Sequence, residues 1–516
     1  MSNRHSDQLF VLIKSLKQTE KRYFNLWVQK NGESNTKYFE LFERIAKQDS
    51  FDDEAILRKS ESIKASQLSN LKAHLYKRLL QALRQFEQEK TEEIQLREQI
   101  DYVQVLYNRG LYRQCENMIT KAHKKIEKSG HLELKLELLK WEKLVLRRTL
   151  GQSYQQKVQR ILKEVADTNE KINLINSVTN LAVELNAIYL KWGYIRNDKQ
   201  LKSVVKLFNR QLPKYNEAEL SLYEKLNLYR TLANYYSFLE EKRDANLYAG
   251  KWLKLYDKNP DLVLSQMDDY LQAINQLMIV QYKMYAYDAF MQNSRRLRDI
   301  GRQHRKHKNL NIRNRIEKYI YVHEFNRIFM LGDFDIGVRL LSKIGDDLEA
   351  FIERSDEHSR VILYYKIACL YVGNSQYSEA LEWLNRVQDE TQEDLREDVL
   401  SFARILSLIA HYELGNTEVM EYYIRSTYRF LLKKGDLNQY QKYILAFLRK
   451  LASGFKQEDL LPEFKLLLEK LKPLQEIRYE QRAFIYFDII SWLESKLENK
   501  QVGEVIREKA LRKINK

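Results

Sequence analysis

The chain of 516 residues contains little of the two residue types that make turns, with 15 glycines and four prolines. These amount to about 3% and about 1% of the residues, whereas globular proteins usually carry about 7% and about 5%. A sheet-rich fold of this length needs many turns, and turns depend on glycine and proline. The composition therefore excludes a β-rich fold and predicts an all-α protein.

Cysteines and long apolar runs are also scarce. The two cysteines, Cys115 and Cys369, stand far apart and lack the spacing of a metal site, which favours buried thiols in a reducing compartment. The N-terminus holds only a five-residue apolar run, LFVLI, which is too short for the core of a signal peptide. No apolar run approaches the roughly 18 residues of a membrane span. We therefore expect a cytoplasmic protein that has no membrane partner.

The motifs of common active sites are missing as well. The sequence has no GxxxxGK[ST] or GxGxxG loop for phosphates, no GxSxG turn and no HExxH zinc motif. Of the nine histidines only His304 and His307 lie close together, and the neighbouring cations in HRKHK repel a metal ion. We therefore expect no enzyme, no metal and no cofactor.

The charge that is present is mixed. The chain has 87 basic and 71 acidic residues, which gives a formal net charge of +16. Helix-rich proteins carry many solvated lysines and arginines, so this excess favours acidic or nucleic-acid partners only weakly.

One stretch has the pattern of two helices joined by a polar turn: VILYYKIA followed by CLYVGNSQYSEALEWLNRV, residues 361–387. Small residues at Ala368 and Ala380 let the helices approach, while aromatic residues such as Tyr364 fill the holes between them. This order of aromatic and small residues around a turn resembles the tetratricopeptide repeat family. The resemblance implies a superhelix of hairpins that binds a protein or peptide along its groove.

Looser versions of the pattern recur along the chain. The small or apolar residue after each turn stands near positions 115, 156, 201, 245, 289, 337, 380 and 420, at intervals of about 40 to 48 residues. The family repeat has about 34 residues, so these hairpins need longer helices. We expect an α-solenoid of tetratricopeptide-like hairpins, about 40–45 residues each, over residues 91–516, with a candidate joint near Pro213.

Residues 1–90 differ from the rest. Their pattern predicts helices near 6–17, 19–30, 36–48, 51–60 and 66–88. The last two suggest a helix-turn-helix, because cations such as Arg58, Lys59 and Lys64 gather there. The connection lacks a glycine-bearing turn and a clear recognition-helix pattern. A small helical domain that caps the array or dimerises is the main interpretation, and a DNA-binding domain is the alternative.

The most basic stretch runs from Arg295 to Arg315, with nine cations and one acid, Asp299. On a helix, four arginines form one stripe opposite an apolar side: Arg295, Arg298, Arg302 and Arg305. This basic stripe is a candidate site for an acidic partner or a nucleic-acid backbone. The alternative is a solvated convex face, because the stripe lies on the second helix of its hairpin and peptides usually bind the concave side.

The resemblance also suggests a carboxylate site. In chaperone-binding members of the family, a cation and an asparagine four residues later on a first helix help to clamp a terminal carboxylate. The matching positions here are Arg230, Asn234 and Asn275, with Gln276 in place of Asn275 if the register shifts by one. The next hairpin offers Tyr319 and His323 where further cations are expected, which departs from the family pattern.

The sequence as a whole favours a non-enzymatic scaffold or adaptor that binds a protein or peptide partner. The alternative is a nucleic-acid-binding or transcription-regulatory protein that uses the basic stripe and the N-terminal domain.

Overall fold

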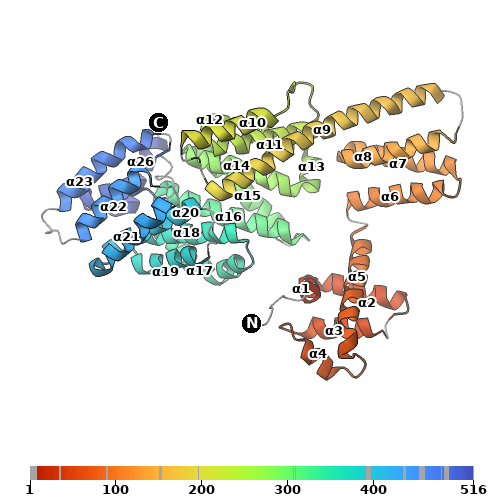
Figure 1. Ribbon diagram of the computed structural model, residues 1–516, viewed down its shortest axis with the longest axis horizontal. Helices are drawn as coiled ribbons and strands as arrows, with labels where there is room; N and C mark the ends of the chain where they lie inside the picture. The colour runs from red at the N-terminus through yellow and green to blue at the C-terminus, as the bar shows by residue number, and fades with distance from the viewer. Residues whose placement is uncertain are drawn as a thin grey trace. The chain divides into compact units, whose positions relative to one another are not determined.

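The computed structural model describes residues 8–33, 36–88, 91–149, 154–193, 195, 197–305, 307, 309–390, 397–433, 437–452, 460–477, 479–480 and 487–514. Within these ranges the chain is helical and contains no β-strand (Figure 1). The expected all-α fold is confirmed. None of the helices in the described ranges is long and apolar enough to cross a membrane.

Residues form two compact units, 1–172 and 173–516. The boundary falls inside α9 (Tyr154–Trp192), a single helix of 39 residues. The repeat spacing predicts a hairpin of two helices in this interval, whereas the structure has one continuous helix. The segment contains no glycine or proline, and nothing in it breaks the helix.

The first unit begins with five helices whose ends lie within about two residues of the predicted ranges. The helices of this unit before α9 are α1 (Gln8–Ser15), α2 (Gln18–Lys30), α3 (Lys37–Lys47), α4 (Asp53–Lys59), α5 (Ala65–Gln88), α6 (Glu92–Tyr107), α7 (Tyr112–Ser129) and α8 (Leu132–Leu146). Helices α1–α5 share one apolar core around Leu41, Leu75 and Leu79, and α6–α8 share another around Leu96 and Ile119. The domain boundary near residue 90 stays a prediction and falls between these cores.

The second unit continues after α9 with the following elements. They are α10 (Asp198–Gln211), α11 (Leu222–Phe238), α12 (Lys242–Lys258), α13 (Pro260–Ser265), α14 (Met267–Lys283), α15 (Tyr287–Gln303), α16 (Leu310–Leu331), α17 (Phe334–Glu353), α18 (Glu357–Gly373), α19 (Tyr377–Glu390), α20 (Glu397–Glu413), α21 (Thr417–Lys433), α22 (Gln439–Ala452), α23 (Leu460–Leu471), η2 (Lys472–Glu476), α25 (Ile489–Glu498) and α26 (Val502–Ile514).

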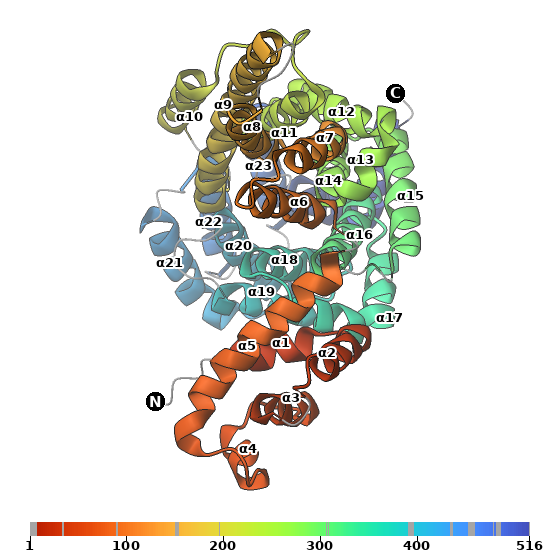
Figure 2. The same ribbon diagram turned by 90° about the vertical axis from the view of Figure 1, so that its right-hand side faces the viewer.

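These helices pack as successive pairs: α11 with α12, α14 with α15, α16 with α17, α18 with α19 and α20 with α21. We call the earlier member of each pair a first helix. The first helices α11, α14, α16, α18 and α20 also pack on one another in that order (Figure 2). This packing is consistent with a helical solenoid. Each of the eight marker positions, 115 to 420, falls in the first turn of a helix.

The hairpin of α18 and α19 has the packing that its sequence predicts. Ala368 and Ala380 are fully buried, which lets the two helices approach. The rings of Tyr364 and Trp383 lie 5.6 Å apart across the pair. Ser375 adopts a left-handed backbone with φ of 59° in the turn between the helices. Small residues at the contact and aromatic residues around it therefore hold this pair together.

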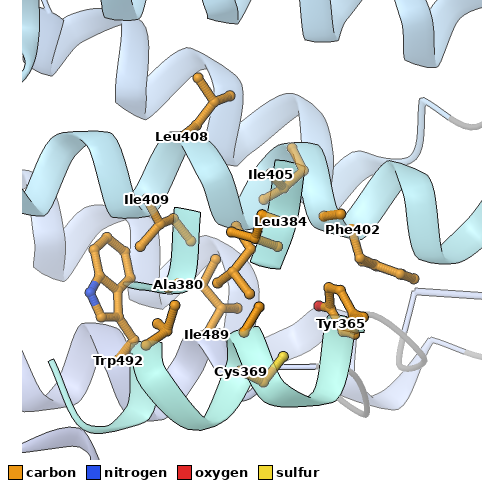
Figure 3. Close-up of a cluster of buried hydrophobic side chains, with 14 of the residues drawn as sticks. Tyr365, Cys369, Ala380, Leu384, Phe402, Ile405, Leu408, Ile409, Ile489 and Trp492 are labelled. Atoms are coloured by element: carbon orange, nitrogen blue, oxygen red, sulfur yellow. The ribbon is translucent and has the colours of Figure 1, made fainter. Parts of the chain in front are cut away.

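Helices from the end of the chain pack on this same core. Figure 3 shows Ile489 and Trp492 of α25 beside Cys369 of α18 and Ile409 of α20, all in one apolar cluster. The last helix, α26, packs on α16. The final two helices thus contact helix pairs that lie well before them in the chain.

The candidate joint near Pro213 lies between α10 and α11. Phe208 in α10 stacks on Tyr235 in α11 with ring centroids 3.5 Å apart, and both belong to one apolar cluster. Side chains on both sides of Pro213 therefore share a core, and the joint stays a prediction.

Candidate functional site

The first helices of the second unit, together with α9, line a cavity of about 470 Å³. Small-ligand sites usually measure about 300–1,000 Å³, so this cavity has the size of a binding site. Among the described residues, its lining includes three lysines, Lys283, Lys318 and Lys366, and no aspartate or glutamate. The cavity is therefore a cationic site among first helices, with both apolar and polar side chains in its wall.

Lys318 lies between this cavity and a second one of about 530 Å³. Its ammonium group donates to Ser359 Oγ at 2.5 Å and lies 4.0 Å from a carboxylate oxygen of Asp356. Removal from water disfavours the charged ammonium, so burial lowers the pKa of Lys318 despite the nearby Asp356. An anionic group in the cavity would offset this cost.

Lys366 begins a relay of hydrogen bonds that crosses three first helices. Lys366 Nζ donates to Asn326 Oδ1 at 2.7 Å, and Asn326 Nδ2 donates to His323 Nδ1 at 3.4 Å. His323 Nε2 then donates to Asn275 Oδ1 at 3.0 Å. Because Asn275 accepts through its oxygen, its amide nitrogen remains as a donor on the residue that lines the cavity.

The histidine in the relay is neutral. His323 is about 1% exposed, and burial together with the nearby charge of Lys366 lowers its pKa to about 3. A neutral imidazole has one donor and one acceptor nitrogen, which are the roles that the relay assigns. His323 therefore orients Asn275 and Asn326 rather than exchanging protons.

The third lysine has a carboxylate partner. Lys283 Nζ lies 2.7 Å from Glu240, and both side chains are nearly buried. Its charge is balanced within the fold. Lys318 lies farther from its carboxylate partner, 4.0 Å from Asp356, and Lys366 donates to the amide oxygen of Asn326.

The structure brings together part of the proposed carboxylate site. Asn234 and Asn275 line the cavity, and so does Gln276, so both registers considered in the sequence reach it. Arg230 does not belong to the lining. Its guanidinium pairs with Asp269 at 2.8 Å. Arg230 thus has a structural partner outside the cavity.

Asp269 is the centre of this contact. Its Oδ2 accepts from Trp252 Nε1 at 2.9 Å and from the Tyr256 hydroxyl at 2.6 Å, while Oδ1 accepts from Arg230. The carboxylate therefore ties α11, α12 and α14 together.

The cations of the cavity are not those that sequence reasoning selected. Tyr319 does line the cavity and His323 is buried behind it, but the charges come from Lys318 and Lys366. A signal for Lys366 exists, since it is a lone cation in the apolar run YYKIACLY. Lys318 has no comparable signal, because charged residues surround it in RIEKYIYVHEF.

The basic stripe lies on α15, outside the cavity. Arg295 and Arg302 are exposed, whereas Arg298 is 3.5 Å from Glu324. Arg305 was expected on the helix, and this expectation is wrong. The helix ends at Gln303, and Arg305 follows its C-cap, His304.

A neighbouring arginine of the same stretch is structural. Arg296 Nε donates to the Tyr270 hydroxyl at 2.7 Å, and its guanidinium also pairs with Asp257. The apolar side of α15, with Phe290 and Leu297, is buried as predicted. The stretch from Arg295 to Arg315 therefore presents fewer available cations than the sequence suggests.

Among the described residues, no group of three or more histidine, cysteine or acidic side chains is arranged to hold a metal ion. The rings of His304 and His307 lie 5.6 Å apart. Burial, and then the neighbouring His307, lower the pKa of His304.

Comparison with known proteins adds no identification. The chain matches no protein-family model, and no curated protein matches its sequence. The tetratricopeptide resemblance stays a prediction, and the functional argument rests on the cavity.

Proposed function

We propose that the chain is a non-enzymatic binding protein whose first-helix cavity takes a short acidic segment of a protein partner. The observation that carries this proposal is the composition of the lining, whose described residues include lysines from three helices and no carboxylate. Lys318 and Lys366 would meet carboxylates of the partner. Such pairs are favoured where the cation is already partly removed from water.

The amides of the cavity support binding of a peptide in particular. Asn234, Asn275 and Gln276 line the cavity on neighbouring first helices. Each side-chain amide can donate and accept, which suits the backbone of an extended segment. The relay from Lys366 holds the Asn275 amide in one orientation, and a preoriented donor binds at a lower entropic cost.

The two cysteines fit a cytoplasmic location, which is part of this proposal. Cys115 and Cys369 are buried free thiols. Burial raises the pKa of Cys369 to about 12, so its reactive thiolate form is disfavoured.

The test is selection of dodecapeptides from a displayed random library on the full chain. We expect enrichment of peptides that carry aspartate or glutamate. Each enriched peptide is then made with a fluorescent label, and its affinity is measured by polarisation. In the double variant Lys318→Gln/Lys366→Gln we expect affinity to fall by about a hundredfold or more, because each lost charge-assisted bond contributes about 1.5–3 kcal/mol.

A matched control is Lys254→Gln/Lys258→Gln, which removes the same charge from exposed positions of α12. This variant should bind the peptide as the natural chain does. The proposal is wrong if no peptide is enriched, or if both double variants lose the same affinity. Circular dichroism checks that each variant keeps its helices.

A further inference from the structure

In the first unit, one face of α5 is not covered by the helices around it. Helices α1, α2 and α3 pack against α5 (Figure 2), and the inner positions Leu68, Leu75 and Leu79 are buried. The opposite face is solvent-exposed at Ser66 and Asn70, one turn apart, and at further positions along the helix. The N-terminal half of α5 therefore has an exposed polar face, which we call the ridge, opposite its buried apolar face.

The ridge has a distinct composition. Its exposed positions include Ser66, Ser69, Asn70, Ala73, His74 and Lys77. No aspartate or glutamate occurs on α5 before Glu87, near its end. An ordinary solvated helix face mixes both charges, whereas this one has small and amide side chains and only positive charge.

The connection before α5 forms a tight turn without glycine. Ser60 Oγ accepts from the backbone N–H of Ile63 at 3.1 Å, and Ile63 is about 3% exposed. The sequence offered no glycine for this turn, which argued against a helix-turn-helix. The Ser60 hydrogen bond and the buried Ile63 side chain hold the turn instead.

An ion pair fixes the preceding helix to the second turn of α5. Lys72 Nζ lies 2.6 Å from a carboxylate oxygen of Asp53 and 4.7 Å from the centre of the Phe51 ring. The Lys72 side chain is only about 15% exposed. Helix α4, the turn and α5 thus form a helix-turn-helix element whose two helices are tied by this ion pair.

Cations gather at the same end of α5. Arg58 and Lys59 lie in the last turn of α4, Lys64 lies in the turn, and all three are exposed. Lys37 in the first turn of α3 donates to Gln67 Oε1 at 3.1 Å, which brings a fourth cation beside the start of α5. These four cations therefore lie near the N-terminal end of the ridge.

We propose that this element binds duplex DNA, with the ridge of α5 in the major groove. The groove admits one α-helix, and serine, asparagine and alanine are side chains that contact base edges or the thymine methyl group. The cations Arg58, Lys59 and Lys64 contact backbone phosphates, which position the helix. This inference is independent of the peptide proposal, because it concerns the other unit.

The first test is fluorescence anisotropy with the full chain and a labelled duplex of about 30 base pairs and random sequence. Affinity should fall steeply as salt rises, since phosphate contacts release counterions. The double variant Lys59→Glu/Lys64→Glu should lower affinity by about tenfold or more at a fixed low salt concentration. Glu61→Lys, at an exposed position of the same turn, should raise it.

The control is Arg295→Glu/Arg302→Glu, which makes the same change of charge on the basic stripe of α15. Affinity for the duplex should stay within about twofold of the natural chain. The proposal is overturned if the stripe variant loses the affinity instead, if no duplex binding is detected at low salt, or if single-stranded RNA binds equally well.

The second test concerns base contacts. Selection from a random duplex pool should yield a preferred sequence for the natural chain. Asn70→Ala should relax the preference at one or two positions and leave the salt dependence unchanged, because it removes a base contact and no phosphate contact. An unchanged preferred sequence in Asn70→Ala, or none with the natural chain, would contradict placement of the ridge in the groove.

Discussion

His323 Nε2 donates a hydrogen bond to Asn275 Oδ1 at 3.0 Å, although 48 residues separate the two in the chain. The bond joins α16 to α14 behind the cavity wall. The bond fixes both the tautomer of the imidazole and the orientation of the Asn275 amide. The packing of α14 against α16 thus determines how this amide is presented to the cavity.

The first prediction concerns pH. The folded pKa of His323 is lowered to about 3, whereas an unfolded histidine has a pKa of about 6.5. Between these pH values the unfolded state binds more protons than the folded state. The free energy of unfolding is therefore highest above a pH of about 6.5 and declines as the pH falls. The decline is about 1.4 kcal/mol per pH unit in this window.

Urea unfolding at pH 7.5 and 5.5, followed by circular dichroism, measures this decline. His323→Gln cannot titrate, so its loss of stability between the two pH values should be smaller than that of the natural chain. Equal losses in both proteins would show that His323 is not buried in its neutral form.

The second prediction concerns Asp269. Asp269→Ala removes the acceptor of Trp252 Nε1 and the carboxylate partner of Arg230, and it leaves the Tyr256 hydroxyl only Gln266 as an acceptor. We expect a loss of about 3–5 kcal/mol in the free energy of unfolding. The control is Asp261→Ala, at an exposed position of α13, which should change stability by less than about 0.5 kcal/mol. Similar effects of the two substitutions would refute the structural role of Asp269.

The third prediction concerns the contact between α16 and α26. Gly332 has φ of +72°, and a Cβ there would lie 2.3 Å from the carbonyl oxygen of Gly503. Gly415 has the same φ and open space around its Cβ position. Gly415→Ala should therefore cost only the backbone strain, about 1 kcal/mol, and Gly332→Ala should cost about 2 kcal/mol more.

Hydrogen exchange of the α26 amides locates the effect. We expect faster exchange there in Gly332→Ala and no change in Gly415→Ala. If the two variants are equally stable, the close approach of α26 to Gly332 is incorrect.

The fourth prediction separates the arginines of the basic stretch. The triple variant Arg298→Glu/Arg302→Glu/Arg305→Glu should keep its melting temperature within a few degrees, about 1 kcal/mol, because these side chains are at least partly exposed. Arg296→Glu should destabilise the chain by about 2–4 kcal/mol, since it places a carboxylate beside Asp257 and removes the donor to Tyr270. A larger effect of the triple variant would mean that the exposed face of α15 is assigned incorrectly.

Sequence reasoning located most helices well, since helix ends depend on neighbouring residues. The ranges of α1–α5 agree within about two residues, and Ala380 packs as its pattern predicts. It failed at α9, where a periodic spacing was read as a hairpin although no residue breaks the helix. It failed also at Arg305, because no glycine or proline follows directly after Gln303 to mark the end of α15.

The cavity was less predictable than the helices. Asn234 and Asn275 were selected from a family pattern, and they do reach the cavity, but Arg230 is held by Asp269. An arginine and its acid partner on another helix cannot be recognised from spacing alone. Lys318 and Lys366 could be assigned to the cavity only from the tertiary structure, in which residues of six helices line it.

By itself, the sequence determined that this protein is built of helices and where most of them begin, because composition and apolar periodicity act over a few turns of the chain. Only the tertiary structure decided which polar side chains share the cavity. Residues such as Asn275 and His323 meet because apolar faces pack α14 against α16, and that packing depends on contacts between residues about 40 to 50 positions apart.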